Sequence, residues 1–274
     1  MLPTDESPGR PDQPGFANTS GNLPESRKTE EQNGSLYPDR STALSGWGTG
    51  ALHTDFAARV EWQPGDTWYQ TRSSGVTLQP VEVVDVGTDD GPRITALMRF
   101  EPNSFFHLEH HIGGTEILIL EGSLCDDQQV YAPGSYLRIP VGHTDQPRSD
   151  TGCLAFIKLG QIEGSDAERR VIDINADPTA WLPGPVDGVE VLPLHGHGNK
   201  SMFMIRWNTA AMFKPGLDPH GEELLVVSGR VHDENGSYGQ YTWLRNPIPA
   251  WQAWSGDAGT LVYYKHGHFP AHLC

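Results

Sequence analysis

The chain contains an internal repeat with a constant spacing of 107 residues. The segment GTEILILEG, which begins at Gly114, returns as GEELLVVSG, which begins at Gly221 (221 − 114 = 107). The same spacing joins identical residues along the rest of both copies: Arg99/Arg206, Asp126/Asp233, Tyr131/Tyr238, Leu137/Leu244, Arg138/Arg245, Pro140/Pro247, Gly152/Gly259 and Lys158/Lys265. A register kept over this length indicates that one domain was duplicated and that both copies retain its strands and turns.

The first 50 residues have no counterpart in the repeat. They contain few large apolar side chains and many Pro, Gly, Ser, Asn, Asp and Glu residues. Such a segment buries too little apolar surface to offset the entropy lost on ordering. We therefore predict a disordered tail over 1–50, a first domain over 51–162 and a second domain over 163–274.

Short apolar segments between turn signals favour an all-β fold. The chain has 31 Gly and 22 Pro, and its apolar runs are too short and too rarely helical in period for long helices. This pattern is typical of a β-sandwich or barrel. We expect strands over 81–86, 94–100, 116–120, 135–139 and 154–159, and again over 189–193, 202–207, 223–227, 241–244 and 260–265. One helical turn is expected near 177–181.

Charge and cysteine content exclude several classes of protein. The chain has 19 Lys and Arg against 35 Asp and Glu, a net charge of −16, which argues against binding to nucleic acid or to an anionic membrane. Three cysteines without CxxC spacing fit a reducing compartment better than a disulfide framework. No leader-like start or membrane-length apolar run is present. We expect a cytoplasmic protein; the oligomeric state stays open, a homodimer included.

Two motifs of the first copy carry the pattern of a known family. The first reads HIGGTEILILEG from His111, and the second reads GSYLRIPVGHTDQPRSDTGC from Gly134. They resemble the paired motifs of the ChrR-type cupins, over 51–162 closely and over 163–268 at the level of the scaffold. The resemblance implies two tandem jelly-roll barrels, a bicupin, with a metal site in a barrel mouth.

The first copy departs from the family pattern at the metal-ligand positions. Counted from Gly122 and Pro140, those positions hold Glu109, His111, Thr115 and Asp145. The resemblance then implies one divalent transition metal, Fe, Mn or Zn, with ligands drawn from Glu109, His111, Glu116, Asp145 and His143. Glu116 enters as a ligand shifted by one residue, and an iron site with two imidazoles would need His143 or His107.

The alternative for these histidines is a rim of polar side chains without a metal. Residues 107, 109 and 111 share one face if this segment is a strand, so His107, Glu109 and His111 could all point inward. Alternatively, His107, His110 and His111 could form a polar cluster at the barrel rim, with no metal. The sequence leaves both interpretations open.

The second copy carries no imidazole at the equivalent positions. These hold Gly216, Asp218, Glu222 and Gln252. We therefore expect a scaffold that has lost its metal. Its large aromatic residues would fill the barrel or line an apolar pocket; they are Trp207, Trp243, Trp251, Trp254 and Tyr263.

Two other histidine pairs and one cysteine receive structural interpretations. His195 and His197 precede Gly198–Asn199 and are expected in an exposed turn. His266 and His268 have no neighbouring carboxylate in the sequence and are not expected to hold a metal. Cys153 is expected in the core as a small apolar residue.

The resemblance implies two functional alternatives. The first is a metal-dependent dioxygenase that cleaves carbon–carbon bonds in diketones or aryl ketones, with a substrate pocket formed by Arg99, Arg138 and Tyr136. Both arginines recur as Arg206 and Arg245, which favours a structural role for them. The second is a non-catalytic cupin that senses a metal or a small ligand. An anti-sigma factor is disfavoured because residues 1–50 contain no His and no Cys.

Overall fold

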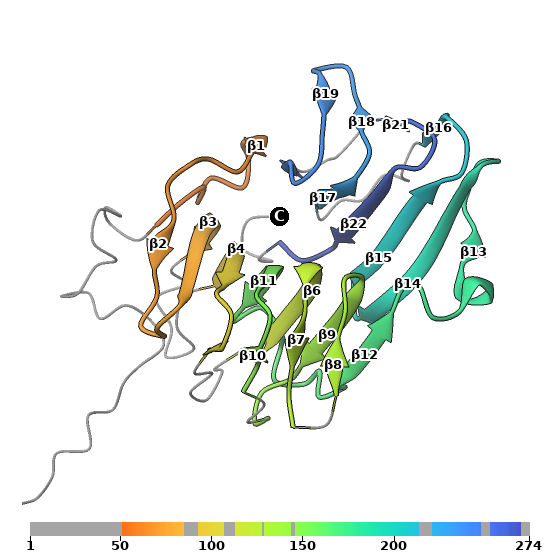
Figure 1. Ribbon diagram of the computed structural model, residues 1–274. Helices are drawn as coiled ribbons and strands as arrows, with labels where there is room; N and C mark the ends of the chain where they lie inside the picture. Colours follow the sequence, from red (N-terminus) through yellow and green to blue (C-terminus); the bar gives the residue numbers. More distant parts are fainter. Residues whose placement is uncertain are drawn as a thin grey trace, which may run out of the picture. The chain divides into compact units, whose positions relative to one another are not determined.

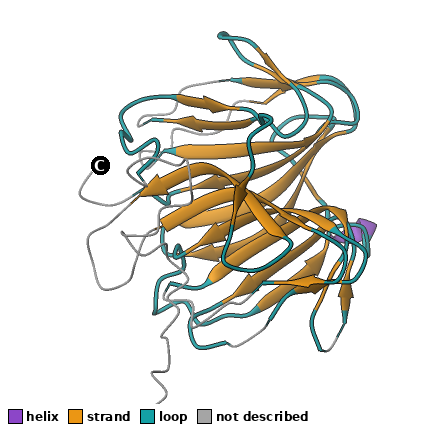
Figure 2. Ribbon diagram, turned by 60° about the vertical axis from the view of Figure 1, so that its left-hand side comes forward, coloured by secondary structure: helices purple, strands orange, loops and turns teal. Residues whose placement is uncertain are grey.

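The computed structural model describes residues 51–84, 93–106, 113–127, 129–143, 146–213, 221–247 and 253–269. Within these ranges the regular structure is β-strand, apart from one 3-10 turn (Figure 2). That turn, η1 (Pro178–Ala180), lies where a helical turn is expected, and the Asp177 side chain caps it by accepting a hydrogen bond from the Thr179 N–H. The predicted all-β class is confirmed. The tail predicted over 1–50 lies outside the described residues.

Two seven-stranded antiparallel sheets form the framework (Figure 1). The first runs in the order β12 (Arg170–Asp173), β9 (Ser135–Ile139), β6 (Thr115–Gly122), β11 (Cys153–Leu159), β4 (Arg93–Phe100), β3 (Val76–Val84) and β2 (Tyr69–Gln70). The second runs β1 (Val60–Trp62), β20 (Trp243–Asn246), β17 (Glu222–Ser228), β22 (Leu261–His266), β15 (Lys200–Trp207), β14 (Val189–His197) and β13 (Leu182–Pro183). Strands of equal rank in the two orders are equivalent, so the repeat in the sequence is a repeat in structure.

A four-stranded sheet accompanies each large sheet and closes a barrel. The first contains β5 (Ser104–Phe105), β10 (Arg148–Ser149), β7 (Leu124–Cys125) and β8 (Val130–Tyr131). The second contains β16 (Ala211–Phe213), β21 (Trp254–Gly256), β18 (Val231–His232) and β19 (Ser237–Tyr238). Leu124 and Tyr131 pack with Ile117 and Ile157 in the core of barrel 1, and Val231 and Trp254 take part in the core of barrel 2. Both barrels are jelly rolls.

The two copies exchange their edge strands. β1 lies at the start of the first copy but pairs with β20 of the second, with Trp62 opposite Trp243. β12 lies at the start of the second copy but pairs with β9 of the first, with Ile172 opposite Tyr136. Each large sheet is therefore completed, and its edge covered, by a strand that the other copy supplies.

A third apolar core lies between the two large sheets. It contains side chains of both copies, including Leu118 and Phe156 from the first and Leu225 and Trp243 from the second. The Phe156 and Tyr263 rings meet edge to face, with 5.6 Å between centroids. The outer faces of both large sheets are thus buried against each other, which explains why their strands form continuous apolar runs in the sequence rather than alternating ones.

Candidate functional site

Backbone contacts bring the two family motifs to one end of barrel 1. The Phe106 N–H donates to the Pro147 carbonyl (2.9 Å), and Thr115 lies opposite Ile139 in the sheet. The segments between these contacts, 107–114 and 140–146, contain the predicted ligands Glu109, His111 and Asp145. These three residues, like His107 and His110, lie outside the described residues.

Glu116 does not face the interior of barrel 1. On β6, Ile117 and Ile119 point into the barrel core, whereas Glu116 points to the other copy. Its carboxylate accepts a hydrogen bond from the Tyr136 hydroxyl (2.9 Å) and pairs with Lys265 (2.6 Å). Burial disfavours the charge, but Lys265, Lys158 and the Tyr136 hydroxyl together outweigh this effect and hold the pKa of Glu116 below its usual value. The shift by one residue from Thr115 thus moves the carboxylate to the opposite face of the sheet, away from a metal in the barrel.

His143 lies at the surface rather than in the barrel interior. Its backbone N–H donates to the Pro140 carbonyl (3.4 Å) in an exposed turn. Among the described residues, the structure therefore brings neither Glu116 nor His143 into the core of barrel 1.

The three residues expected to form a substrate pocket have structural partners on the outer face of the first large sheet. The Arg99 guanidinium stacks over Trp68 (3.9 Å), and Arg206 stacks over Trp181 (4.2 Å) at the equivalent place in the second copy. Arg138 is buried and donates to the Glu168 carbonyl (2.6 Å). The third residue, Tyr136, donates to Glu116 as described above. The recurrence of both arginines therefore reflects the packing of each sheet.

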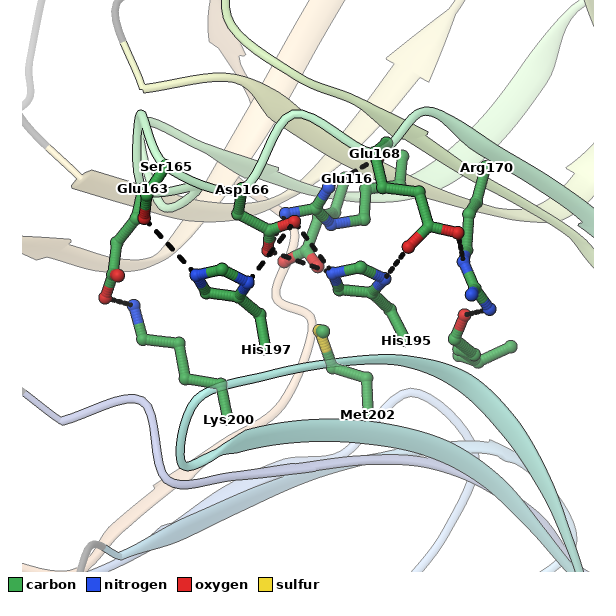
Figure 3. Close-up of polar contacts among 12 residues, drawn as sticks. Glu116, Glu163, Ser165, Asp166, Glu168, Arg170, His195, His197, Lys200 and Met202 are labelled. Atoms are coloured by element: carbon green, nitrogen blue, oxygen red, sulfur yellow. Dashed lines mark hydrogen bonds and ion pairs between the residues drawn. The ribbon is translucent and has the colours of Figure 1, made fainter.

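A polar cluster lies where the segment that joins the copies crosses β14 (Figure 3). Asp166 is at its centre, paired with Arg138 and with the Nε2 atom of His195 (2.9 Å). The Nδ1 atom of His195 lies 3.7 Å from the Glu168 carboxylate, and that of His197 lies 3.9 Å from Asp166. Both imidazoles point from β14 toward the linking segment (Figure 3).

The expectation of an exposed turn is wrong for His195. β14 extends to His197, and a bulge after Pro193 shifts the register, placing His195 opposite Met202 with 5% of its surface exposed. The turn itself is formed by Gly198 and Asn199. Glu82 holds the equivalent position in the first copy, after a matching bulge at Pro80, and pairs with Arg245. A bulge is not visible in apolar periodicity, so the sequence does not indicate this burial.

A small cavity adjoins this cluster. It is lined by Glu116, Arg138, Asp166, His197, Lys200 and Lys265, among others, and its volume of about 10 Å³ is close to the minimum for one water molecule. Its acidic and basic side chains are balanced in number and paired with each other. The cavity suits a structural water better than a substrate.

Two ion pairs cross the interface between the copies in a reciprocal manner. Lys158 of the first copy pairs with Glu223 of the second (2.5 Å), and Lys265 of the second pairs with Glu116 of the first. All four side chains are nearly inaccessible to solvent. Burial opposes the charge of Glu223, but Lys158 and its other neighbours hold its pKa well below the usual value.

His268 is also buried at this interface. Its Nε2 atom lies 3.4 Å from the Glu223 carboxylate. Burial lowers the pKa of His268 to about 4, although Glu223 acts in the opposite direction, so the imidazole is neutral at pH 7. Within the described ranges, no group of three His, Cys, Asp or Glu side chains is arranged to hold a metal ion.

The interior of barrel 2 carries a carboxylate that its own side chains satisfy. Glu222, at the position equivalent to Thr115, is buried and accepts hydrogen bonds from Asn246 (2.8 Å), Trp254 (3.2 Å) and Tyr264 (2.6 Å). Neutral donors around one carboxylate form a closed network rather than an open metal site. The residues at the other ligand positions, Gly216, Asp218 and Gln252, lie outside the described residues.

The described cysteines are unpaired thiols in the interior. Cys125 and Cys153 are both buried and form no disulfide. Burial raises the pKa of Cys153 to about 12. Cys153 belongs to the apolar core of barrel 1, as expected. Its thiol stays protonated at neutral pH and is therefore a poor nucleophile.

Two fused jelly rolls with a shared interface define the chain as a bicupin. The model of the ChrR Cupin-like domain family matches residues 57–163 and again residues 169–270. The chain therefore belongs to this family, with one family domain in each copy. Among curated protein sequences, none matches the chain.

Solved structures of other cupins share the fold at low sequence identity. A proposed dioxygenase from Nostoc punctiforme is 11% identical, with a TM-score of 0.56 over 78% of this chain and 80% of that chain. Protein YlbA from E. coli is 12% identical, with a TM-score of 0.55 over 85% of this chain and 99% of that chain. An oxalate decarboxylase is 13% identical, with a TM-score of 0.50 over 76% of this chain and 77% of that chain. At these identities the likeness shows the fold alone.

No helix in the described part of the chain has the length and apolar character needed to cross a membrane.

Proposed function

We propose that barrel 1 binds one divalent transition metal through Glu109, His111 and Asp145, and that the chain acts on a small molecule as a non-haem metal-dependent dioxygenase. The observation that carries the proposal is the pair of backbone contacts at the barrel end, Phe106 with Pro147 and Thr115 with Ile139. They hold the ends of both motif segments together, so ligands from the two segments have a short distance to span.

The donor set suits a metal that accepts oxygen ligands. One imidazole and two carboxylates fit Mn²⁺, Fe²⁺ or Zn²⁺. Thr115 contributes only a neutral hydroxyl at the position of the usual family carboxylate. We therefore expect looser metal selectivity and lower affinity than a cupin with three imidazoles and a carboxylate provides.

A metal with three protein ligands keeps open positions for a chelating substrate. When bound, it would polarise two substrate oxygens, such as those of a β-diketone. The apolar core of barrel 1 would keep water from the reacting carbons. When one carbon–carbon bond of the substrate is cleaved with O₂, each of the two carbonyl-containing products receives one oxygen atom of O₂. The reaction therefore balances without a further reductant.

The test compares matched substitutions in the two copies. Metal content by mass spectrometry and O₂ uptake with 2,4-pentanedione are measured for the full-length protein, for His111→Ala and for Asp218→Ala, its equivalent in copy 2. We expect His111→Ala to lose both metal and O₂ uptake with an unchanged circular dichroism spectrum, and Asp218→Ala to retain both. Stoichiometric metal in His111→Ala would overturn the assignment.

The alternative function is sensing of a metal or ligand without catalysis. It is favoured by the replacement of the family carboxylate with Thr115 and by the orientation of Glu116 away from the barrel. A protein that binds metal at His111 but consumes no O₂ with diketones or aryl ketones would support this alternative. We place either function in a reducing, cytoplasmic compartment, in keeping with the free thiols of Cys125 and Cys153.

A further inference from the structure

One hydroxyl group in the described part of barrel 1 has no partner there. Thr115 is completely buried at the start of β6, and its side-chain oxygen forms no hydrogen bond with any described residue. It stands on the same face of β6 as Ile117 and Ile119, which belong to the core of barrel 1. Buried hydroxyl groups are nearly always hydrogen-bonded, because leaving one unpaired costs free energy.

The equivalent position of barrel 2 is built in the opposite way. Glu222 stands there, and the neighbouring side chains Asn246, Trp254 and Tyr264 all donate to it. Barrel 2 thus supplies its own partners and closes this end of its interior with two large aromatic side chains.

Barrel 1 has apolar residues in place of these partners. Subtracting the repeat spacing of 107 from Asn246, Trp254 and Tyr264 gives Ile139, Pro147 and Ile157. All three are buried, and none has a polar side-chain atom. Since Ile139 lies directly opposite Thr115, the hydroxyl has an apolar wall where its counterpart has donors.

The charged side chains of the first large sheet do not enter barrel 1. Glu116 and Lys158 are buried, but both pair across the interface with the other copy. Arg138 and Glu82 pair with Asp166 and Arg245, also at that interface. Since these four are the buried charged residues described on the strands of the first large sheet, an ionised ligand in barrel 1 would find no counter-charge among them.

We propose that Thr115 is a specificity-determining contact of barrel 1: its hydroxyl donates a hydrogen bond to an oxygen of a small, neutral and largely apolar ligand. The ligand class follows from the surroundings, because the described walls are apolar and the free polar group on them is a neutral hydroxyl. This inference rests on the proposed function only in placing the substrate in barrel 1. It adds the residue that would contact the ketone or diketone, and it disfavours an anionic substrate held by Arg99 or Arg138.

The experiment compares two substitutions that separate the hydroxyl group from the shape of the side chain. Thr115→Val keeps the shape and removes the oxygen, whereas Thr115→Ser keeps the oxygen. Full-length protein with ¹³C-labelled isoleucine δ1-methyl groups is titrated with 2,4-pentanedione, once after EDTA treatment and once with diamagnetic Zn²⁺ added. Ile139 and Ile157 report on barrel 1, and Ile205 in the core of barrel 2 serves as the control signal.

We expect 2,4-pentanedione to shift the Ile139 and Ile157 signals and to leave Ile205 unchanged. Loss of one hydrogen bond should weaken binding about 5- to 30-fold in Thr115→Val. Thr115→Ser should bind within about threefold of the wild type. Pentanoate, of similar size but ionised at pH 7, should not shift these signals. The melting temperature of Thr115→Val should not fall, because its hydroxyl has no partner among the described residues to lose.

Two results would overturn the inference. One is equal affinity of Thr115→Val and the wild type for 2,4-pentanedione, together with a lower melting temperature, which would mark the hydroxyl as a structural group. The other is binding of pentanoate as tight as that of the ketone. If the proposed function is wrong, the protein would hold no metal and consume no O₂. The titration of the metal-free protein would still test the role of Thr115.

Discussion

Lys158 and Glu223 form a charge pair that lies wholly inside the protein, with its two partners on different copies. Lys158 also donates to the Thr95 hydroxyl (2.9 Å), so its ammonium group is held from two sides. A buried pair of this kind adds little net stability compared with apolar side chains, because both ions lose their hydration. Removing one partner is far more costly, since the other charge is then left alone in the interior.

We predict that Lys158→Met destabilises the protein by about 3–5 kcal/mol, as expected when a buried carboxylate loses its partner. Adding Glu223→Leu should recover most of this loss. The matched control is Lys200→Met, which breaks the more exposed pair with Glu163 and should cost at most about 1 kcal/mol. Urea denaturation measures the free energy of unfolding of the wild type and of these variants. Equal effects of Lys158→Met and Lys200→Met would contradict the prediction.

At the residue scale, the sequence predicts positions in the fold better than the orientation of side chains. The spacing of 107 residues is enough to place Glu222 at the position of Thr115. It does not indicate that Glu116 faces Lys265, because alternation on β6 is hidden where both faces of a strand are buried. The partner lies 149 positions away in the chain. Contacts between residues so far apart in the sequence leave no local sequence pattern.

The exchanged strands connect the copies at the element scale. β1 is only three residues long and yet carries several links to the second copy. Arg59, just before it, donates to Asn246 and Tyr238 and pairs with Asp233. Val60 is buried in the core between the sheets. Neither β1 nor β12 can be predicted from the sequence, since strands this short show no alternation and their pairing depends on the whole fold.

We predict that two truncations differ sharply in effect. Removal of residues 1–50 should change the melting temperature by no more than about 1 °C, because their composition does not support a packed core. Removal of residues 1–62 also deletes β1 and leaves the edge of β20 unpaired, so the melting temperature should fall by several degrees or more. Differential scanning calorimetry compares the two. A large loss on removing 1–50 would show that the tail docks on the protein.

Strand positions can be predicted well where the apolar run is long and less well at its ends. β4, β9 and β11 agree with expectation to within one residue at each end. β14 runs four residues past its expected end at Pro193, because the chain continues through a bulge instead of turning. The connection between β3 and β4 has eight residues and that between β14 and β15 has two. This difference of six (8 − 2) explains why the repeat spacing is 113 before β4 and 107 after it.

For the whole molecule, the interface between the copies is a core rather than a contact surface. It combines the apolar cluster between the large sheets, the exchanged strands and the two reciprocal ion pairs. A copy on its own would expose all of these at once. The small size of each barrel predicts such sharing in outline, but strand exchange and paired charges depend on contacts between distant parts of the chain.

We predict that residues 163–274 do not fold when expressed alone. The fragment lacks β1, so the edge of β20 is open, and it exposes the apolar face that the second large sheet buries against the first copy. Lys265 and Glu223 on this face lose their partners Glu116 and Lys158. It should be insoluble or lack a cooperative unfolding transition, whereas co-expression with residues 1–162 should yield a soluble complex, because β12 can then pair with β9. Solubility, gel filtration and urea unfolding monitored by tryptophan fluorescence provide the measurements. A soluble fragment that unfolds cooperatively as a monomer would mean that barrel 2 is stable without the interface.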